Sequence, residues 1–210
     1  MIVIGLTGSI GMGKSTVAHM MREKNIPVHD SDACVHFLLE PGGRGVQPAG
    51  QKFPEALALN EKGQEYIDRD VLGRLVFEDR ARKKELEDIL HPMVRAESDK
   101  FVEEIRARGH TMAALDIPLL YETGAEERVD VVIVVSAPHD VQKKRVLERP
   151  GMTSEKFDRV VAGQMPDAEK RKRAHYIIEN GGDLDDTRQQ LDEIINRISA
   201  SHPRAAAPGK

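Results

Sequence analysis

The fold is decided by the stretch Gly8-Ser9-Ile10-Gly11-Met12-Gly13-Lys14-Ser15-Thr16, which matches the phosphate-binding pattern GxxxxGK[S/T]. The apolar run from Ile2 to Thr7 predicts a strand before it, and Lys14 to Glu23 predicts a helix after it. Glycines in such a loop let backbone N–H groups point at phosphate oxygens, beside the positive end of the helix. The sequence therefore predicts a site for a nucleoside triphosphate.

Two side chains of the loop are suited to phosphate chemistry. Lys14 would bring a mobile positive charge to the β- and γ-phosphates, and the hydroxyl of Ser15 can ligate the Mg²⁺ that bridges them. We expect Ser15 to be the metal ligand. The predicted nucleotide-binding residues of the loop are Gly8, Gly11, Met12, Gly13, Lys14, Ser15 and Thr16.

The rest of the chain alternates predicted strands and helices. Continuous apolar runs suit a parallel sheet that is covered on both faces, and further strands are expected at Ile26 to His29, Met112 to Leu120, Asp130 to Ser136 and Tyr176 to Glu179. A final helix presents one apolar stripe to this sheet through Leu191, Ile194, Ile195 and Ile198. The prediction is an α/β fold of the P-loop NTPase type, with three layers and a five-stranded parallel sheet.

Two mainly helical stretches interrupt this alternation within a single domain. The core is expected at residues 1–31, 110–138 and 175–200, with a frayed tail at 201–210. The first interruption, 32–109, is a helical insert, in which Asp68 is expected to be an N-cap, Gly109 a C-terminal stop, and Pro41 to Pro54 a loop.

The second interruption, residues 139–174, is predicted to be a helical lid. Its helices are broken at Pro150-Gly151 and at Pro166, and Thr153 is placed to cap the middle one. Between His139 and His175 the chain carries ten Lys and Arg against six Asp and Glu, a local excess of +4. This excess predicts either a solvated helical face or the attraction of a polyanionic substrate.

Bulk properties exclude several classes of protein. A net charge of −4 argues against a general nucleic-acid binder. No run approaches the roughly 18 apolar residues of a membrane span, and no signal peptide is recognised, so we expect a soluble cytoplasmic protein without a membrane partner. The single cysteine, Cys34, excludes an internal disulfide and is interpreted as a half-buried structural thiol.

Carboxylates after two of the predicted strands are candidates for the acceptor side of a transfer reaction. Asp30 and Asp32 follow the second predicted strand, at the edge of the sheet where ligands bind in open α/β folds. Either residue could orient an acceptor hydroxyl, or simply cap the next helix. Asp116 is a second candidate, because a carboxylate beside the loop can hold Mg²⁺ through water.

The residues quoted so far, together with others in the same order, resemble the dephospho-CoA kinase family almost from end to end. GLTGSIGMGKSTVA resembles its phosphate loop, and HDSDACVH resembles the stretch with its catalytic aspartate, here Asp32. Less generic segments that follow in family order are IDRDVLGRLVF (67–77), LHP (90–92), DIPLLYE (116–122), QKKRVLER (142–149), QMP (164–166) and NGG (180–182).

This resemblance implies an ATP-dependent kinase that phosphorylates the ribose 3′-hydroxyl of dephospho-CoA, the last step of coenzyme A biosynthesis. It implies that Gly11 to Thr16 bind the triphosphate, that Asp32 and Lys14 are catalytic, and that the insert binds the acceptor. Arg145 and Arg149 of the lid would approach the nucleotide, and Asn180 would lie near the adenine. His91-Pro92 and Arg69 belong to the insert without an assigned contact, and Arg69 could equally bridge to a neighbouring helix.

Two positions depart from the family pattern, and two other functions share the loop. His175 stands where the family usually shows Asp, and Pro54 where Gly is common. A nucleoside or nucleotide kinase would share the loop, the lid and the chemistry, and would differ mainly in the acceptor pocket. A GTP-dependent switch protein would be expected to carry an NKxD segment, which this sequence lacks.

Overall fold

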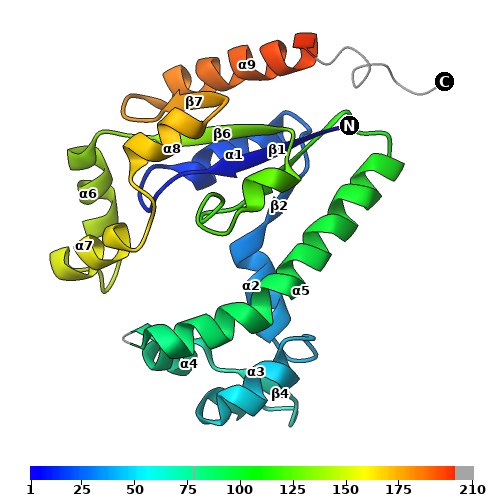
Figure 1. Cartoon of the computed structure of the whole chain (residues 1–210), viewed down its shortest axis with the longest axis vertical. Helices are drawn as coiled ribbons and strands as arrows, with labels where there is room; N and C mark the ends of the chain where they lie inside the picture. Colours follow the sequence, from blue (N-terminus) through cyan, green and yellow to red (C-terminus); the bar gives the residue numbers. More distant parts are fainter. Residues whose placement is uncertain (78, 202–210) are drawn as a thin grey trace. The chain divides into compact units, whose positions relative to one another are not determined.

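The computed structural model describes residues 1–77 and 79–201 (Figure 1). In chain order its elements are β1 (Ile2–Thr7), α1 (Lys14–Glu23), β2 (Val28–Asp30), α2 (Ser31–Leu39), α3 (Val46–Lys52), η1 (Pro54–Ala56), β3 (Leu57–Leu59), β4 (Glu65–Ile67), α4 (Arg69–Phe77), α5 (Arg80–Ala107), β5 (Met112–Asp116), η2 (Ala125–Arg128), β6 (Val131–Ser136), α6 (His139–Leu147), α7 (Ser154–Ala162), α8 (Asp167–Arg173), β7 (Tyr176–Glu179) and α9 (Leu184–Ser201). They form two compact units, one of Met1–His29 with the chain from Val102 onward and the other of Asp30–Phe101.

The first unit is built on a five-stranded parallel sheet in the order β2-β5-β1-β6-β7, which confirms the predicted fold class. β1 lies at its centre, with Ile4 paired to Ala114 of β5 and to Val131 of β6. The predicted third strand was too long, because β5 ends at Asp116. Pro118 has no N–H for a sheet ladder, so the apolar residues after Asp116 form a loop instead.

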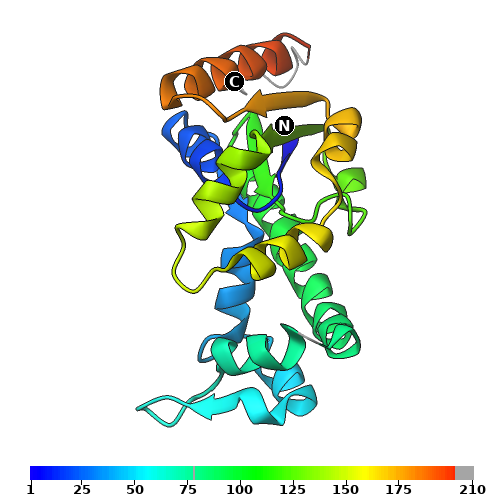
Figure 2. The ribbon, with the colours of Figure 1, turned by 90° about the vertical axis from the view of Figure 1, so that its left-hand side faces the viewer.

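One face of the sheet packs against α1 and α9. Alternate residues of β1 and β6, such as Ile4 and Ile133, join Val17 and Met21 of α1 in one buried cluster. The predicted stripe of the last helix enters the same cluster, with Leu191, Ile194 and Ile198 buried and Ile195 partly buried. Figures 1 and 2 show α9 running beside β7.

The opposite face of the sheet packs against the loop after β5 and the end of α8. Val132 and Val134 of β6 meet Leu120 and Tyr121 in a second cluster, with Ala174 packed against it. A Cβ atom on Gly5 of β1 would lie 2.7 Å from Leu120 Cδ1, so the loop approaches the strand too closely for a side chain there. Both faces of the sheet are therefore covered, which explains the continuous apolar runs of its strands.

The second unit, Asp30–Phe101, has its own core. Phe53, Ile67, Leu72 and Leu90 are buried there together. The expectation of a mainly helical insert is correct, although β3 and β4 form a short antiparallel hairpin that the sequence did not predict. The predicted loop at 41–54 was wrong in part, because α3 occupies 46–52. Its Pro48 lies in the first turn, where a missing N–H costs no helical hydrogen bond.

Three predicted helix boundaries are confirmed. Asp68 Oδ1 accepts hydrogen bonds from the N–H groups of Asp70 (2.9 Å) and Val71 (3.0 Å) at the start of α4. Gly109, with φ +79°, follows the end of α5. Thr153 accepts a bond from the N–H of Lys156 at the start of α7. These signals were readable because each depends on residues close together in the chain.

The stretch 139–174 contains α6, α7 and α8, which follow one another from yellow-green to amber in Figure 2. Their breaks coincide with Pro150-Gly151 and Pro166, as predicted. Of the predicted tail, Ser201 ends α9 and the rest lies outside the described residues. The lid, insert and tail boundaries of the sequence analysis stay predictions. Within residues 1–77 and 79–201, no helix has the length and apolar character to cross a membrane.

Candidate functional site

The phosphate-binding loop between β1 and α1 has a backbone that only glycine can adopt at its critical points. Gly11 and Gly13 have φ values of +77° and +90°. A Cβ atom on Gly13 would lie 1.7 Å from Asn180 Nδ2, and one on Gly11 would lie 2.5 Å from Val146 Cγ2. A Cβ atom on Gly8 would likewise lie 2.5 Å from Val135 O. The loop is therefore packed against the residues around it and is not an open turn.

The N-terminus of α1 is an anion-binding end. Its N-cap is Gly13, no side chain among the described residues caps it, and its first turn holds no acidic residue. Ser15 is exposed there, beside the half-buried Lys14 and Thr16. N–H groups at such an end lack helical partners and, with the helix dipole, favour a negative charge.

Lys14 is paired with Asp116, the last residue of β5. Lys14 Nζ forms an ion pair with Asp116 Oδ1, and the side chains are only 14% and 3% exposed. The structure thus brings together the predicted loop lysine and the carboxylate that sequence reasoning proposed for Mg²⁺. The pair balances the lysine charge in a largely buried position. Phosphate oxygens would give the ammonium group an alternative anionic partner.

Asn180 lies directly behind the loop. It is 2% exposed, its Nδ2 donates to Met12 O at 2.9 Å, and its Oδ1 accepts from Thr187 Oγ1 at 3.0 Å. The side chain therefore holds the loop backbone, a role that sequence reasoning did not assign. Its predicted position near an adenine stays a prediction. Thr187 was missed altogether, since a threonine in a helix carries no signal of such a contact.

The two predicted lid arginines differ in their surroundings. Arg145, half-buried on α6, donates from Nη1 to Asn180 O at 2.8 Å. Its Nη1 is also 3.6 Å from the position that a Cβ atom on Gly13 would take, so Arg145 lies beside the loop. Arg149 is exposed beyond the C-terminus of α6. The structure places Arg145 beside the loop, and contact of Arg145 and Arg149 with a nucleotide stays a prediction.

Asp30 and Asp32 differ in what their carboxylates contact. Asp30 Oδ1 accepts a hydrogen bond from Ala33 N at 2.9 Å and is the N-cap of α2. Asp32 lies in the first turn of the same helix and is exposed. The capping alternative therefore applies to Asp30, and the carboxylate of Asp32 is accessible in its own unit, Asp30–Phe101. The half-buried Cys34 follows, and burial raises the pKa of its thiol.

The second unit contains a cavity of about 370 Å³. Arg69, which sequence reasoning left without a contact, lines it together with His36 and Tyr66. The other lining residues are Leu39, Glu40, Ile67, Asp68 and Asp70. The cavity thus has one aromatic ring and one guanidinium group in a mostly polar lining that includes three carboxylates.

A magnesium ion fits the loop only as a partner of a bound nucleotide. No group of three or more His, Cys, Asp or Glu within residues 1–77 and 79–201 could hold a metal ion. Mg²⁺ in phosphate-transfer sites is usually held by one or two protein oxygens together with phosphate and water, not by an all-protein cage. The exposed hydroxyl of Ser15 at the N-terminus of α1 suits that arrangement.

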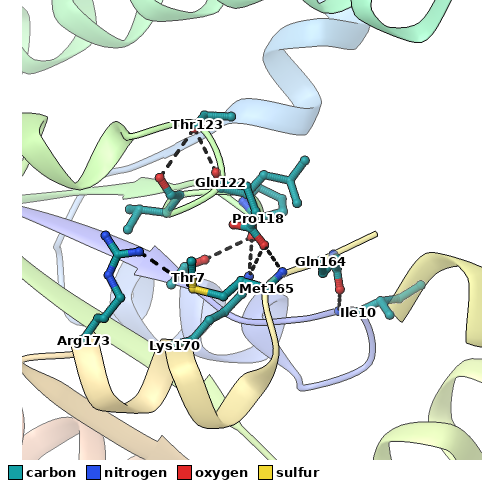
Figure 3. Close-up of polar contacts among 11 residues, drawn as sticks. Thr7, Ile10, Pro118, Glu122, Thr123, Gln164, Met165, Lys170 and Arg173 are labelled. Carbon is teal, nitrogen blue, oxygen red and sulfur yellow. Dashed lines mark hydrogen bonds and ion pairs between the residues drawn. The ribbon is translucent and has the colours of Figure 1, made fainter. Parts of the chain in front are cut away.

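Sequence reasoning missed a partly buried polar network between the loop and the 139–174 stretch, part of which is drawn in Figure 3. Gln142 and Gln164 both contact Ile10, and Lys170, which is 0% exposed, contacts Glu122 and Pro118. The segment QMP was recognised as part of the family resemblance, but nothing in it indicated a contact with Ile10. Lysine is almost never fully buried, so its type alone argued for the surface.

Some of the basic residues of the 139–174 stretch form ion pairs that hold α8 in the fold. Three cations of α8 form ion pairs with glutamates of the first unit: Lys170 with Glu122, Arg171 with Glu179, and Arg173 with Glu126. Arg173 also lies over the Tyr121 ring, 4.4 Å from its centroid. Of these three side chains Lys170 is buried, whereas Arg171 and Arg173 are 35% and 44% exposed, so part of the charge excess forms ion pairs and the two predicted interpretations stay open.

Comparison with known proteins identifies the relatives of this chain. The family model for dephospho-CoA kinase matches residues 2–186. A dephospho-CoA kinase from Mesorhizobium japonicum is 48% identical over 198 residues, which cover 94% of this chain and 97% of the relative. Similarity of this extent reaches beyond the phosphate loop to the insert and the lid segments.

Solved structures agree with these matches. The Thermus thermophilus protein TT1252 superposes with a TM-score of 0.77 at 38% identity, covering 94% of this chain and 97% of that one. Dephospho-CoA kinase from Campylobacter jejuni superposes with a TM-score of 0.70 at 28% identity, covering 95% of this chain and 98% of that one.

Proposed function

The chain belongs to the dephospho-CoA kinase family, and we propose that it transfers the γ-phosphoryl group of ATP to the ribose 3′-hydroxyl of dephospho-CoA. The observation that supports this most directly is the phosphate loop, whose left-handed glycines lead into a helix N-terminus without a capping side chain among the described residues. Segments resembling the family occur from this loop to Asn180-Gly181-Gly182. They support dephospho-CoA over a nucleoside or nucleotide as acceptor.

On the donor side, the loop binds the triphosphate. The backbone from Gly11 to Thr16 directs its N–H groups at phosphate oxygens, and Lys14 exchanges Asp116 for the phosphates as its anionic partner. Phosphoryl transfer passes through a loose transition state, so catalysis consists mainly of positioning and charge stabilisation. Lys14 and the loop supply both.

Ser15 is the residue that would hold Mg²⁺ with the nucleotide. The ion neutralises charge on the β- and γ-phosphates when it is bound. Asp116 is a candidate to contact the ion through water, since its carboxylate forms an ion pair with Lys14 of the loop. Chelation of Mg²⁺ by EDTA is expected to abolish turnover, and added Mg²⁺ to restore it.

On the acceptor side, Asp32 orients the ribose 3′-hydroxyl for in-line attack and accepts its proton. Its carboxylate suits this role because it is exposed, whereas that of Asp30 is used by a helix cap. The cavity lined by Arg69, His36 and Tyr66 in the same unit is a candidate site for the remainder of the acceptor. The insert 32–109 is thus assigned to acceptor binding.

The stretch 139–174 serves as the lid. Arg145 and Arg149 neutralise charge on the transferring group. Asn180 holds the loop through Met12 O and borders the adenine. Exclusion of water by a lid prevents hydrolysis of ATP, which would compete with transfer to the acceptor.

The test is ADP release by the purified protein with Mg²⁺-ATP, comparing dephospho-CoA with nucleosides and nucleoside monophosphates. Turnover on dephospho-CoA alone, with a product heavier by one phosphate, is expected. Turnover only on a nucleoside or nucleotide would replace the proposal with that alternative. Asp32→Asn is expected to reduce kcat strongly with the fold intact. Near wild-type activity in folded Asp32→Asn would remove Asp32 from the mechanism.

A further inference from the structure

Ile10, in the middle of the phosphate loop, is bonded on both sides by glutamines from the 139–174 stretch. Gln142 Nε2 donates to Ile10 O at 2.8 Å, and Ile10 N donates to Gln164 Oε1 at 3.0 Å. Gln142 is 3% exposed and belongs to α6, whereas Gln164 lies between α7 and α8. The peptide groups before and after Ile10 are therefore oriented by two side chains that lie more than 130 residues away in the chain.

The position of Gln164 is itself restrained by a partly buried network, shown in Figure 3. The next residue, Met165, donates its N–H to Glu122 Oε1 at 2.7 Å. The same oxygen contacts Lys170 Nζ at 3.0 Å, and Lys170 also donates to Pro118 O at 3.3 Å. Pro118 O accepts a further bond from Thr7 Oγ1 at 3.1 Å, at the end of β1. Gln164 is thus tied to the core on which the phosphate loop stands.

The orientation of the backbone at Ile10 affects phosphate binding because the next residue of the loop is Gly11. Gly11 has φ +77°, and a glycine can exchange this conformation for others at little cost. A rotation of either peptide group beside Ile10 would redirect the N–H groups that follow. Binding of phosphate by the loop requires those groups to be oriented in advance, since ordering them during binding would reduce the affinity.

We propose that Gln164 is a positioning residue of the phosphate loop, which makes the nucleotide affinity depend on the junction between α7 and α8. Gln164 acts through Ile10, and Gln142 holds the other side of the same residue. The kinetic consequence rests on the proposed ATP-dependent transfer, whereas the restraint on the Ile10 amide can be measured without any substrate.

The experiment compares Gln164→Leu with Gln190→Leu. Gln190 is a matched control, because its Oε1 likewise accepts a hydrogen bond from a backbone N–H, that of Glu179, at 2.8 Å. Gln190 Nε2 also donates to Glu179 O at 3.0 Å, at the end of β7. Amide hydrogen exchange by NMR reports the Ile10 N–H, thermal unfolding reports the fold, and steady-state kinetics report KM for ATP and kcat.

In Gln164→Leu we expect the Ile10 amide to exchange at least about tenfold faster and KM for ATP to rise about three- to tenfold, as the loss of one hydrogen bond allows. Both values should stay near wild type in Gln190→Leu, and kcat should change less than KM in either variant. Gln164→Glu keeps an acceptor oxygen and should recover the protection of the Ile10 amide.

Two results would overturn the proposal. One is unchanged exchange of the Ile10 amide in folded Gln164→Leu, which would mean that the bond does not restrain the loop. The other is an equal rise of KM for ATP in both leucine variants, which would indicate general loosening of the unit. If the protein had no kinase activity, the exchange rate of the Ile10 amide would still test the restraint by Gln164. Failure of the proposed kinase function and failure of the proposed role of Gln164 can therefore be distinguished.

Discussion

Helices α6 and α8 lie at opposite ends of the same basic stretch, and they use their cations differently. On α8, Lys170, Arg171 and Arg173 are paired with glutamates of the core. On α6, Arg145 contacts a backbone carbonyl beside the phosphate loop, and the exposed Arg149 lies just beyond the helix. The charge excess read from the sequence therefore includes cations that fasten a helix, one that lies beside the phosphate loop, and others that are exposed.

This difference bears on how a lid can move. A helix with a fully buried lysine and two further ion pairs to the core is expected to stay in place when the nucleotide binds. The chain between Arg149 and Gln164, which contains α7, is the part that we expect to close. α8 would then serve as its fixed end.

The largest expected effect belongs to α6. Arg145→Ala should lower kcat/KM about 10²- to 10³-fold, as found when one donor to a developing charge is removed. The melting temperature should change little, because Arg145 is only half-buried and contacts a single carbonyl. ADP-release kinetics and thermal unfolding measure the two quantities.

Arg145→Lys serves as the matched variant, because it keeps the charge without the planar guanidinium group. An intermediate loss of activity is expected from it. If Arg145→Ala reduced stability but left kcat/KM unchanged, α6 would resemble α8 and the contrast between the two helices would disappear.

The next largest effect belongs to α8. Lys170→Met should lower the free energy of unfolding by about 3 kcal/mol, the lower end of the range for breaking a buried pair, because the Glu122 side chain is 19% exposed. Urea unfolding measures this loss. Adding Glu122→Gln removes the unpaired charge while keeping an acceptor for Met165 N, so the double variant should regain part of the stability. Equal stability of wild type and Lys170→Met would refute the fastening role.

A smaller effect is expected where α8 leads into β7. His175 Nδ1 accepts a hydrogen bond from the N–H of Val132 at 3.1 Å. His175→Asp should keep an acceptor there and stay near wild-type stability. His175→Ala should lower the free energy of unfolding by about 1–2 kcal/mol, because a buried N–H loses its partner. Chemical denaturation measures the free energy of unfolding of both variants. Equal losses in His175→Asp and His175→Ala would show that the hydrogen-bond acceptor is unimportant.

The smallest effect is expected from Arg171→Ala. Its ion pair with Glu179 is partly exposed, so the free energy of unfolding should fall by less than about 1 kcal/mol. Activity should stay within about twofold of wild type, in contrast to Arg145→Ala. A large loss of kcat/KM in Arg171→Ala would place an α8 cation in the phosphate chemistry and remove the distinction.

Local patterns were read correctly from the sequence. The phosphate loop, β1, α1 and β7 have the predicted bounds, and Asp68, Gly109 and Thr153 end or begin helices as expected. The errors had two causes. α3 forms in a Pro- and Gly-containing stretch because Ala49 and Phe53 enter the core of the second unit, so packing overrides local preference there. β5 ends at Asp116 because Pro118 lacks an N–H, a local signal that the prediction overlooked.

The sequence by itself determined the nucleotide loop, the parallel sheet and the family, because these depend on neighbouring residues and on long apolar runs. Only the tertiary structure decided that Asn180 holds Met12, that two glutamines hold Ile10, and that Lys170 is buried. The physical reason is that each of these contacts joins residues far apart in the chain. A glutamine or lysine has the same local preference on a surface as inside such a network, and only the packed sheet and helices supply its partners.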